Sequence, residues 1–170
     1  QIEPHATLSE YDPTTGRLTV QTVSQVGYYL HLMIAQCLEM DSSRIRVIKP
    51  RIGGGFGGKQ EVLMEDVAAH LTIATRRPVL YEYSREEEFI GARSRHPMRV
   101  HMKTGVKKDG TITAIEFKNY SNMGAYLRSG GGADGARNYL VPNVSTESIR
   151  VHTNTSCGAN YRAPAGPQGA

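Results

Sequence analysis

One glycine-rich stretch, residues 51–60 with the sequence RIGGGFGGKQ, constrains this chain more than any other segment. Five glycines occur within six residues, and only Phe56 interrupts them. Such a backbone can adopt positive φ angles and can approach a ligand closely, and successive free N–H groups in it can form an anion-binding concavity. The stretch follows a strand-like apolar segment, 45–48, and precedes a predicted helix. We therefore interpret it as a loop that holds a cofactor, and call it the glycine loop.

Length and composition exclude several classes of protein. The chain has 170 residues, of which 39% are hydrophobic and 21% charged, as expected for one soluble globular domain. The net charge is only +4 and the basic residues are scattered, so we expect no nucleic-acid partner. The apolar stretches are too short and too mixed to cross a bilayer, so we expect no membrane partner. The two cysteines, Cys37 and Cys157, form no CxxC pair, which favours a reducing, cytoplasmic location.

The two ends indicate a piece of a longer protein. The chain starts at Gln1 without a methionine and stops at Ala170, where a helix is about to begin. No basic and apolar leader opens the sequence, so we expect no signal peptide. We expect residues 1–170 to form a single domain-sized fragment.

Hydrophobic periodicity predicts a mixture of strands and helices. Strands are predicted over 7–11, 17–22, 45–48, 79–83, 100–106, 111–119 and 144–151. Helices are predicted over 28–38 and 63–75, the second packing an apolar stripe against the core: Leu63, Met64, Val67, Ala68, Leu71 and Ala74. The turn at 107–110 predicts a hairpin. This pattern indicates an α+β fold with mixed sheets and packed helices.

A short helix with an acidic start is predicted after the strand at 79–83. Ser84 and Glu87 match the capping box. The run 86–88, three glutamates, is interpreted as a solvated helix face. The glycine-rich segment 129–135 is predicted to be a loop without regular structure.

Motif matching leaves three interpretations of the glycine loop open. Gly53, Gly58 and Lys59 fit a phosphate loop, but Gln60 replaces the hydroxyl that would ligate magnesium. The spacing of three of the glycines also fits a dinucleotide fingerprint, but no acidic residue follows at the required distance. The third interpretation is a tight turn without a ligand. A nucleotide-binding module using Gly53–Lys59 is kept as the alternative function.

Several segments, in the same order, resemble the xanthine dehydrogenase and aldehyde oxidase family of molybdenum hydroxylases. The resemblance covers nearly the whole chain. Its residues are the segment 2–6 (IEPHA), Gln25, the loop 51–59 (RIGGGFGGK), the segment 95–97 (RHP) and the segment 161–168 (YRAPAGPQ). The resemblance implies that the chain is part of the large, molybdopterin-binding subunit.

The resemblance also implies a set of site residues. Gln25 would hydrogen-bond the apical oxo group of the molybdenum, the backbone N–H of Phe56 would face the metal's oxygen ligands, and the backbone at Arg162 would contact the metal site from the other side. Gly54, Gly55 and Gly57 would bind the cofactor as parts of the glycine loop. Fixed N–H donors of this kind stabilise developing oxyanion charge.

Enzymes of this family transfer oxygen from water to an electron-poor carbon, and the electrons leave through iron–sulfur clusters, usually to FAD. The resemblance therefore implies iron–sulfur and flavin subunits or domains as partners, together with the remainder of the molybdenum subunit. It assigns no catalytic residue here, because the family's base glutamate would lie beyond residue 170.

The substrate stays open between an N-heterocycle, an aldehyde and an aromatic acyl thioester. Gln60 is the candidate substrate residue, where xanthine-specific relatives have a glutamate. The segment 129–132 lacks their substrate arginine, and Pro164 stands where they have an aromatic residue. A catalytically idle scaffold subunit is a further alternative.

Overall fold

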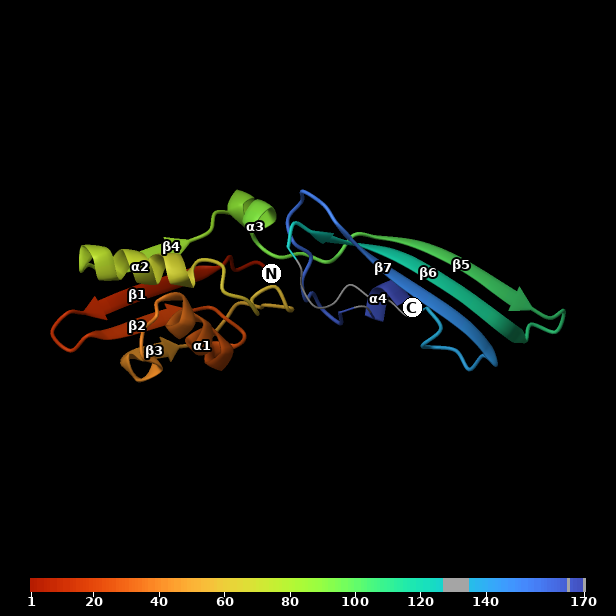
Figure 1. The fold of residues 1–170 in the computed structure, drawn as a ribbon, viewed down its shortest axis with the longest axis horizontal. Coiled ribbons are helices and arrows are strands. Elements are labelled where there is room, and N and C mark those ends of the chain that lie inside the picture. Colours follow the sequence, from red (N-terminus) through yellow and green to blue (C-terminus); the bar gives the residue numbers. More distant parts are fainter. Residues whose placement is uncertain (127–134, 165, 170) are drawn as a thin grey trace. The chain divides into compact units, whose positions relative to one another are not determined.

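The computed structural model describes residues 1–126, 135–164 and 166–169, and the chain forms two compact units (Figure 1). Unit 1 comprises Gln1–Ala92 and unit 2 comprises Arg93–Ala170. Each unit is an α+β arrangement around its own sheet, which confirms the predicted fold class. That residues 1–170 make up one domain-sized fragment stays a prediction.

Unit 1 is built on a mixed four-stranded sheet. Its strands are β1 (Ala6–Asp12), β2 (Arg17–Thr22), β3 (Ile45–Ile48) and β4 (Val79–Glu82), in the order β3-β2-β1-β4. β1 runs antiparallel to β2 and β4, while β2 and β3 are parallel. All four strands occur where the alternation of apolar residues predicts them.

Two helices cover one face of this sheet (Figure 1). They are α1 (Gly27–Cys37) and α2 (Glu65–Thr75), and a short 3-10 turn, η1 (Ser42–Arg44), lies between α1 and β3. The buried core takes residues from both helices and from two strands of the sheet: Leu18, Val20, Leu30, Ile34, Ile45 and Ala69. The helices therefore pack against a common apolar layer. The glycine loop follows β3, which is an edge strand of the sheet.

The apolar stripe predicted for α2 is wrong in part, because Met64 and Ala68 are buried as predicted but other members are not. Val67 and Leu71 are 45% and 46% exposed, and the helix begins at Glu65 rather than at residue 63. Its buried face is instead small and polar: Glu65, Ala68, Ala69 and Thr72. The Glu65 carboxylate accepts hydrogen bonds from the Thr22 hydroxyl at 2.8 Å and from the N–H of Leu63 at 3.0 Å. Because these bonds satisfy the carboxylate, it can be buried, and the small residues beside it let α2 approach β1 closely.

The capping box at the start of α3 (Arg85–Gly91) is confirmed. The Ser84 hydroxyl accepts from the N–H of Glu87 at 3.2 Å, and the Glu87 carboxylate accepts from the N–H of Ser84 at 2.7 Å. The solvated face predicted for 86–88 is wrong for its last residue, because the Glu88 side chain is only 7% exposed. Glu88 turns inward toward the first residues of the chain.

Unit 2 contains a long three-stranded sheet, in the order β5-β6-β7 (Figure 1). β5 (Met98–Val106) and β6 (Ile112–Gly124) form the predicted hairpin, and β7 (Asn143–His152) runs parallel to β6. Ile115, Phe117 and Ala136 form its small core. A short helix, α4 (Gly166–Gly169), follows. Most of the predicted loop 129–135 lies outside the described residues.

No helix within the described ranges is both long and apolar enough to span a membrane.

Candidate functional site

The glycine loop closes on a tight turn with two consecutive positive φ angles. The N–H of Gly58 donates to the Gly55 carbonyl at 2.8 Å, and the two central residues, Phe56 and Gly57, have φ angles of 51° and 90°. These values are those of a type I′ turn. Positive φ is uncommon for a bulky residue, and the left-handed region costs an L-residue about 1–2 kcal/mol. The Phe56 backbone is thus held in a strained conformation, which points to a function for its position.

Gln25, at the end of the segment that follows β2, ties the far side of this turn. Its side-chain Oε1 accepts from the N–H of Gly57 at 2.9 Å and from the N–H of Lys59 at 3.2 Å. Its backbone N–H donates to the Lys59 carbonyl at 2.8 Å. A Cβ at Gly55 would lie 2.4 Å from Gln25 Oε1, so any larger residue there would displace the Gln25 side chain or the turn. The structure therefore brings Gln25 and the loop together, as the sequence predicts.

Three successive N–H groups of the loop remain available. Those of Gly53, Gly57, Gly58 and Lys59 all donate within unit 1. Within the part of the chain that the structure describes, the N–H groups of Gly54–Phe56 make no hydrogen bond, and neither does the Gln25 Nε2. A row of fixed amide donors beside a carboxamide donor suits a ligand that presents oxygen atoms carrying negative charge.

The Lys59 side chain is paired with a carboxylate of the protein. It is fully buried, and its Nζ lies 2.7 Å from Glu3 Oε2. Burial raises the pKa of Glu3, but the hydrogen bonds from Lys59 and Gly53 and the charge of Lys59 outweigh it and hold the pKa below its ordinary value. A phosphate loop needs its lysine at the ligand. Because Lys59 is committed to Glu3, the geometry gives the nucleotide-binding alternative no support.

A second buried pair lies beside the loop. His5 Nδ1 is 2.8 Å from Glu88 Oε1, and its Nε2 is 3.2 Å from the Gly58 carbonyl oxygen. The N–H of His5 also donates to Glu88 Oε2 at 3.1 Å. Burial raises the pKa of Glu88, but the bonds and charge of His5, with a bond from Gln1, bring that pKa below its ordinary value.

We expect the contribution of Glu88 to stability to disappear in acid. A carboxylate whose pKa is lowered by folding stabilises the protein above its unfolded pKa, and this contribution is lost as pH falls through the folded value. The difference in unfolding free energy between the wild type and Glu88→Gln should therefore shrink as the pH is lowered from about 7 to about 3, below the ordinary carboxyl range. Urea denaturation across this range measures it.

Glu86→Gln is the matched control, since Glu86 is exposed on the same helix. It removes one carboxylate from α3 without touching His5 or Gln1, so it controls for the loss of a charge on the helix. A Glu88→Gln difference that stays constant down to the acid end would contradict the prediction.

In unit 2, the segment 94–97 holds the loop that carries Arg162. Arg95 Nη2 donates to the Arg162 carbonyl at 2.7 Å, and its guanidinium carbon lies 5.1 Å from the centre of the Tyr161 ring. The N–H of Ala159 donates to the Ser94 carbonyl at 3.0 Å. The backbone of the second predicted cofactor loop is thus fixed by the residues just before β5.

His96 packs beneath this loop as a buried ring. A Cβ at Gly158 would lie 2.4 Å from its Cδ2, so the two segments are in close contact. Burial is the main cause that lowers the pKa of His96, and the charges of Arg150 and Arg95 add to it. The ring is therefore a neutral packing element of unit 2.

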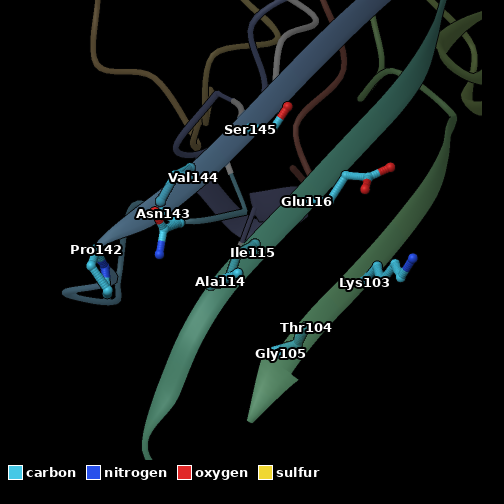
Figure 2. Close-up of a pocket in the computed structure, with 10 residues that line it drawn as sticks. All are labelled: Lys103, Thr104, Gly105, Ala114, Ile115, Glu116, Pro142, Asn143, Val144 and Ser145. Atoms are coloured by element: carbon cyan, nitrogen blue, oxygen red, sulfur yellow. The ribbon is translucent and has the colours of Figure 1, made fainter.

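A cavity of about 600 Å³ lies in unit 2 at the sheet, and its lining contains none of the predicted site residues. Figure 2 shows its lining, which comes from all three strands and from the residue before β7: Lys103, Thr104, Gly105, Ala114, Ile115, Glu116, Pro142, Asn143, Val144 and Ser145. No other sequence motif falls there, and we assign it no ligand.

The remaining predicted site residues lie in different units of the chain. Gln60 is half-buried directly after the glycine loop in unit 1. Arg162 is exposed in unit 2, and the segment 129–132 lies outside the described residues. Among the residues described, no three His, Cys, Asp or Glu side chains cluster as metal ligands.

Sequence reasoning missed the polar side chains that hold the loops: Glu3, His5, Lys59, Glu88 and Arg95. Their contacts join residues up to 87 positions apart, so no local pattern reveals them. A lysine inside a glycine-rich loop was the one available signal, and it suggested phosphate binding instead.

The chain matches known proteins over its full length. A family model described as molybdopterin cofactor-binding domain matches residues 1–170. The chain belongs to this family. Its resemblance to the molybdenum hydroxylases is thereby confirmed, and the cofactor of the family is molybdopterin.

Two relatives and one solved structure illustrate the match. The chain is 37% identical over 159 residues to the protein named Probable hypoxanthine oxidase XdhD of Escherichia coli O157:H7, covering 90% of this chain and 17% of the relative. It is 36% identical over 173 residues to the nicotinate dehydrogenase large molybdopterin subunit of Eubacterium barkeri, covering 98% and 40%. Quinoline 2-oxidoreductase from Pseudomonas putida 86 superposes with a TM-score of 0.88 at 30% identity, covering 96% and 22%. The chain thus spans less than half the length of these proteins.

Proposed function

We propose that this molybdopterin-binding chain forms one wall of the active site of a molybdenum hydroxylase. The observation that carries the proposal is the row of unpaired N–H groups at Gly54–Phe56 beside Gln25. In a chain of this family, a cluster of donors without protein partners suits the oxygen ligands of the molybdenum.

The residues present fit this cofactor. The Phe56 N–H is the central candidate, because its strained backbone sets the direction of the donor. Gln25 presents Nε2 as a donor while its Oε1 is held by the loop. Gly54 and Gly55 add two further N–H groups. Gly57 instead shapes the turn, because it has a positive φ and donates its N–H to Gln25. When bound, the cofactor would supply a centre that oxidises a substrate carbon by two electrons with water as the source of oxygen.

Two residues outside this row have further proposed roles. Gln60 would contact the substrate through its carboxamide. Arg162 would contribute from the second loop through its backbone, whose carbonyl is held by Arg95. In this role Arg95 orients the loop and does not touch the substrate.

The whole protein would oxidise an N-heterocycle or an aldehyde in the cytoplasm. This proposal draws on relatives and structures whose names include hypoxanthine, nicotinate, quinoline and aldehyde. Iron–sulfur clusters and FAD on partner subunits or domains would carry the electrons away. Gln60 offers no carboxylate and counts against a purine substrate, whereas the relative named for hypoxanthine, itself a purine, counts in favour of one.

Metal analysis of the complete native protein tests the proposal. We expect about one molybdenum atom and one pterin per chain, and turnover with an N-heterocycle or aldehyde. The isolated 170-residue chain should hold no molybdenum and show no turnover, because one wall cannot retain the cofactor. Calorimetric titration of the isolated chain with ATP and NAD should show no binding. A complete protein without molybdenum that binds a nucleotide through this loop would overturn the assignment.

A further inference from the structure

The first residues of the chain hold the beginning and the end of the glycine loop. We call residues 1–5 the N-terminal strap. Glu3 Oε2 accepts from the N–H of Gly53 at 2.7 Å and from Lys59 Nζ at 2.7 Å. A single carboxylate oxygen therefore bridges the residues immediately outside the segment 54–58.

A second contact of the strap reaches the last glycine of the loop. His5 Nε2 lies 3.2 Å from the Gly58 carbonyl oxygen, while His5 Nδ1 faces both oxygens of Glu88, at 2.8 and 2.9 Å. Both nitrogens of the ring therefore face oxygen atoms, one on the loop and the others on α3. The imidazole is thereby fixed between α3 and the loop.

The strap is itself fastened to α3. The Gln1 Nε2 donates to Glu88 Oε1 at 2.7 Å. The Arg85 guanidinium donates to the carbonyls of Gln1 and Ile2. The residues on either side of Glu3 are therefore fixed by α3.

The charges of this assembly are costly for a merely structural device. The Lys59 side chain is fully buried, and taking an ammonium group out of water carries a large penalty that one ion pair barely offsets. An apolar residue of similar length would fill the same space. The charge of Lys59 instead orients the Glu3 carboxylate, and this carboxylate accepts the N–H of Gly53.

We propose that Glu3, Lys59 and Glu88 are positioning residues, which aim the N–H groups of Gly54–Phe56 at the oxygen ligands of the molybdenum. This rests on the proposed function of the glycine loop. A segment with five glycines has many accessible conformations, and Gln25 holds only its later half. The strap supplies the missing hold at Gly53, directly before the first free donor.

Amide hydrogen exchange in the complete protein tests whether the strap restrains the glycine loop, and this measurement does not require bound cofactor. Lys59→Met removes the charge and keeps the length of the side chain, so Glu3 loses one partner. Glu88→Gln weakens the hold on His5 and is the second variant, in case the first fails to fold. We expect the amides of Gly53 and Gly57 to exchange about tenfold faster in both variants, with exchange in β1 and β2 unchanged.

Glu147→Gln is the matched control, since it breaks an exposed ion pair with Lys118 of the same 2.7 Å length in unit 2. It should leave the exchange of Gly53 and Gly57 unchanged. Wild-type exchange rates at these amides in both Lys59→Met and Glu88→Gln would overturn the proposal.

Turnover and spectroscopy of the molybdenum-loaded enzyme test whether the strap positions the N–H donors at the cofactor. Turnover per bound molybdenum atom should fall by about tenfold to a hundredfold, as a displacement near 1 Å would cause, and the electron paramagnetic resonance spectrum of the Mo(V) state should change shape. Unchanged turnover per molybdenum with an unchanged spectrum would overturn the positioning role. A wild-type protein that lacks molybdenum would overturn the proposed function instead, and the exchange experiment would still show whether the strap holds the loop.

Discussion

Replacing Gln25 by glutamate is expected to lower turnover of the complete enzyme by about 10²–10³-fold, the loss that follows removal of one oxyanion donor. The carboxylate would still accept the N–H groups of Gly57 and Lys59, which Gln25 Oε1 accepts at 2.9 and 3.2 Å. It would no longer offer the Nε2 donor, and its negative charge would oppose the oxygen ligands of the molybdenum. Steady-state kinetics normalised to bound molybdenum measures the loss.

Comparing Gln25→Ala with Gln25→Glu distinguishes the role of the side-chain oxygen, Oε1, from the role of the side-chain nitrogen, Nε2. Alanine removes the acceptor as well as the donor, so two partly buried N–H groups lose their partner, at a cost of about 1–3 kcal/mol in unfolding free energy. Sequence reasoning alone gives Gln25 only the role of a donor, which would leave folding almost unaffected. The structure adds the role in holding the loop, so we expect Gln25→Ala to lose both turnover and stability.

The comparison of the two variants decides which role dominates. Gln25→Glu should keep the wild-type unfolding midpoint in urea while it loses turnover, and Gln25→Ala should lose both. If Gln25→Glu kept wild-type turnover per molybdenum, the Nε2 would have no part in the site, and Gln25 would only hold the loop.

The order and type of the main elements follow from local sequence patterns. Strands β1 to β4 and the hairpin of unit 2 occur where apolar alternation and turn residues predict them, because each pattern acts over a few neighbouring residues. The face of α2 does not follow from its pattern. Glu65 can be buried because Thr22, 43 positions away, donates to it together with the N–H of Leu63, while Val67 and Leu71 are exposed.

The candidate site shows the same division between local and distant information. The glycine loop stands out in the sequence because its composition is unusual. Its contact with Gln25 comes from family resemblance, not from spacing, since 32 residues separate Gln25 from Gly57. The segment 2–6 contributes to the family resemblance, but its contact with the loop has no sequence signal, because Glu3 and Lys59 are joined only by the path of the folded chain.

Replacing Gly55 by alanine is expected to abolish retention of the molybdenum cofactor. The added Cβ would lie 2.4 Å from both Cδ and Oε1 of Gln25, so either the Gln25 side chain or the turn must move. Gln25 is held in place by the N–H groups of Gly57 and Lys59, so the strain falls on the turn that sets the Phe56 donor. Overpacking of this kind costs about 1–3 kcal/mol. Molybdenum content per chain and urea denaturation measure the two effects.

Gly27→Ala is the matched control. A Cβ there would lie 4.0 Å from its nearest neighbours, and the position is the first residue of α1 rather than part of the loop. We expect this variant to keep its full molybdenum content and its stability. Loss of molybdenum in Gly27→Ala as well would show that the assay reports folding in general and not the loop.

The double variant Gly55→Ala with Gln25→Ala identifies the clash as the cause. Removing the Gln25 side chain vacates the space that the Cβ at position 55 would enter, so the two stability losses should not add, and the shortfall should reach about 0.5–3 kcal/mol. Turnover should stay low, because the donor at Gln25 is absent in the double variant. Strictly additive losses would mean that Gly55 is needed for another reason, such as the approach of the cofactor to the backbone between Gly54 and Phe56. This double-mutant cycle therefore distinguishes two reasons for glycine at position 55: to leave room for the Gln25 side chain, or to let the cofactor approach the backbone.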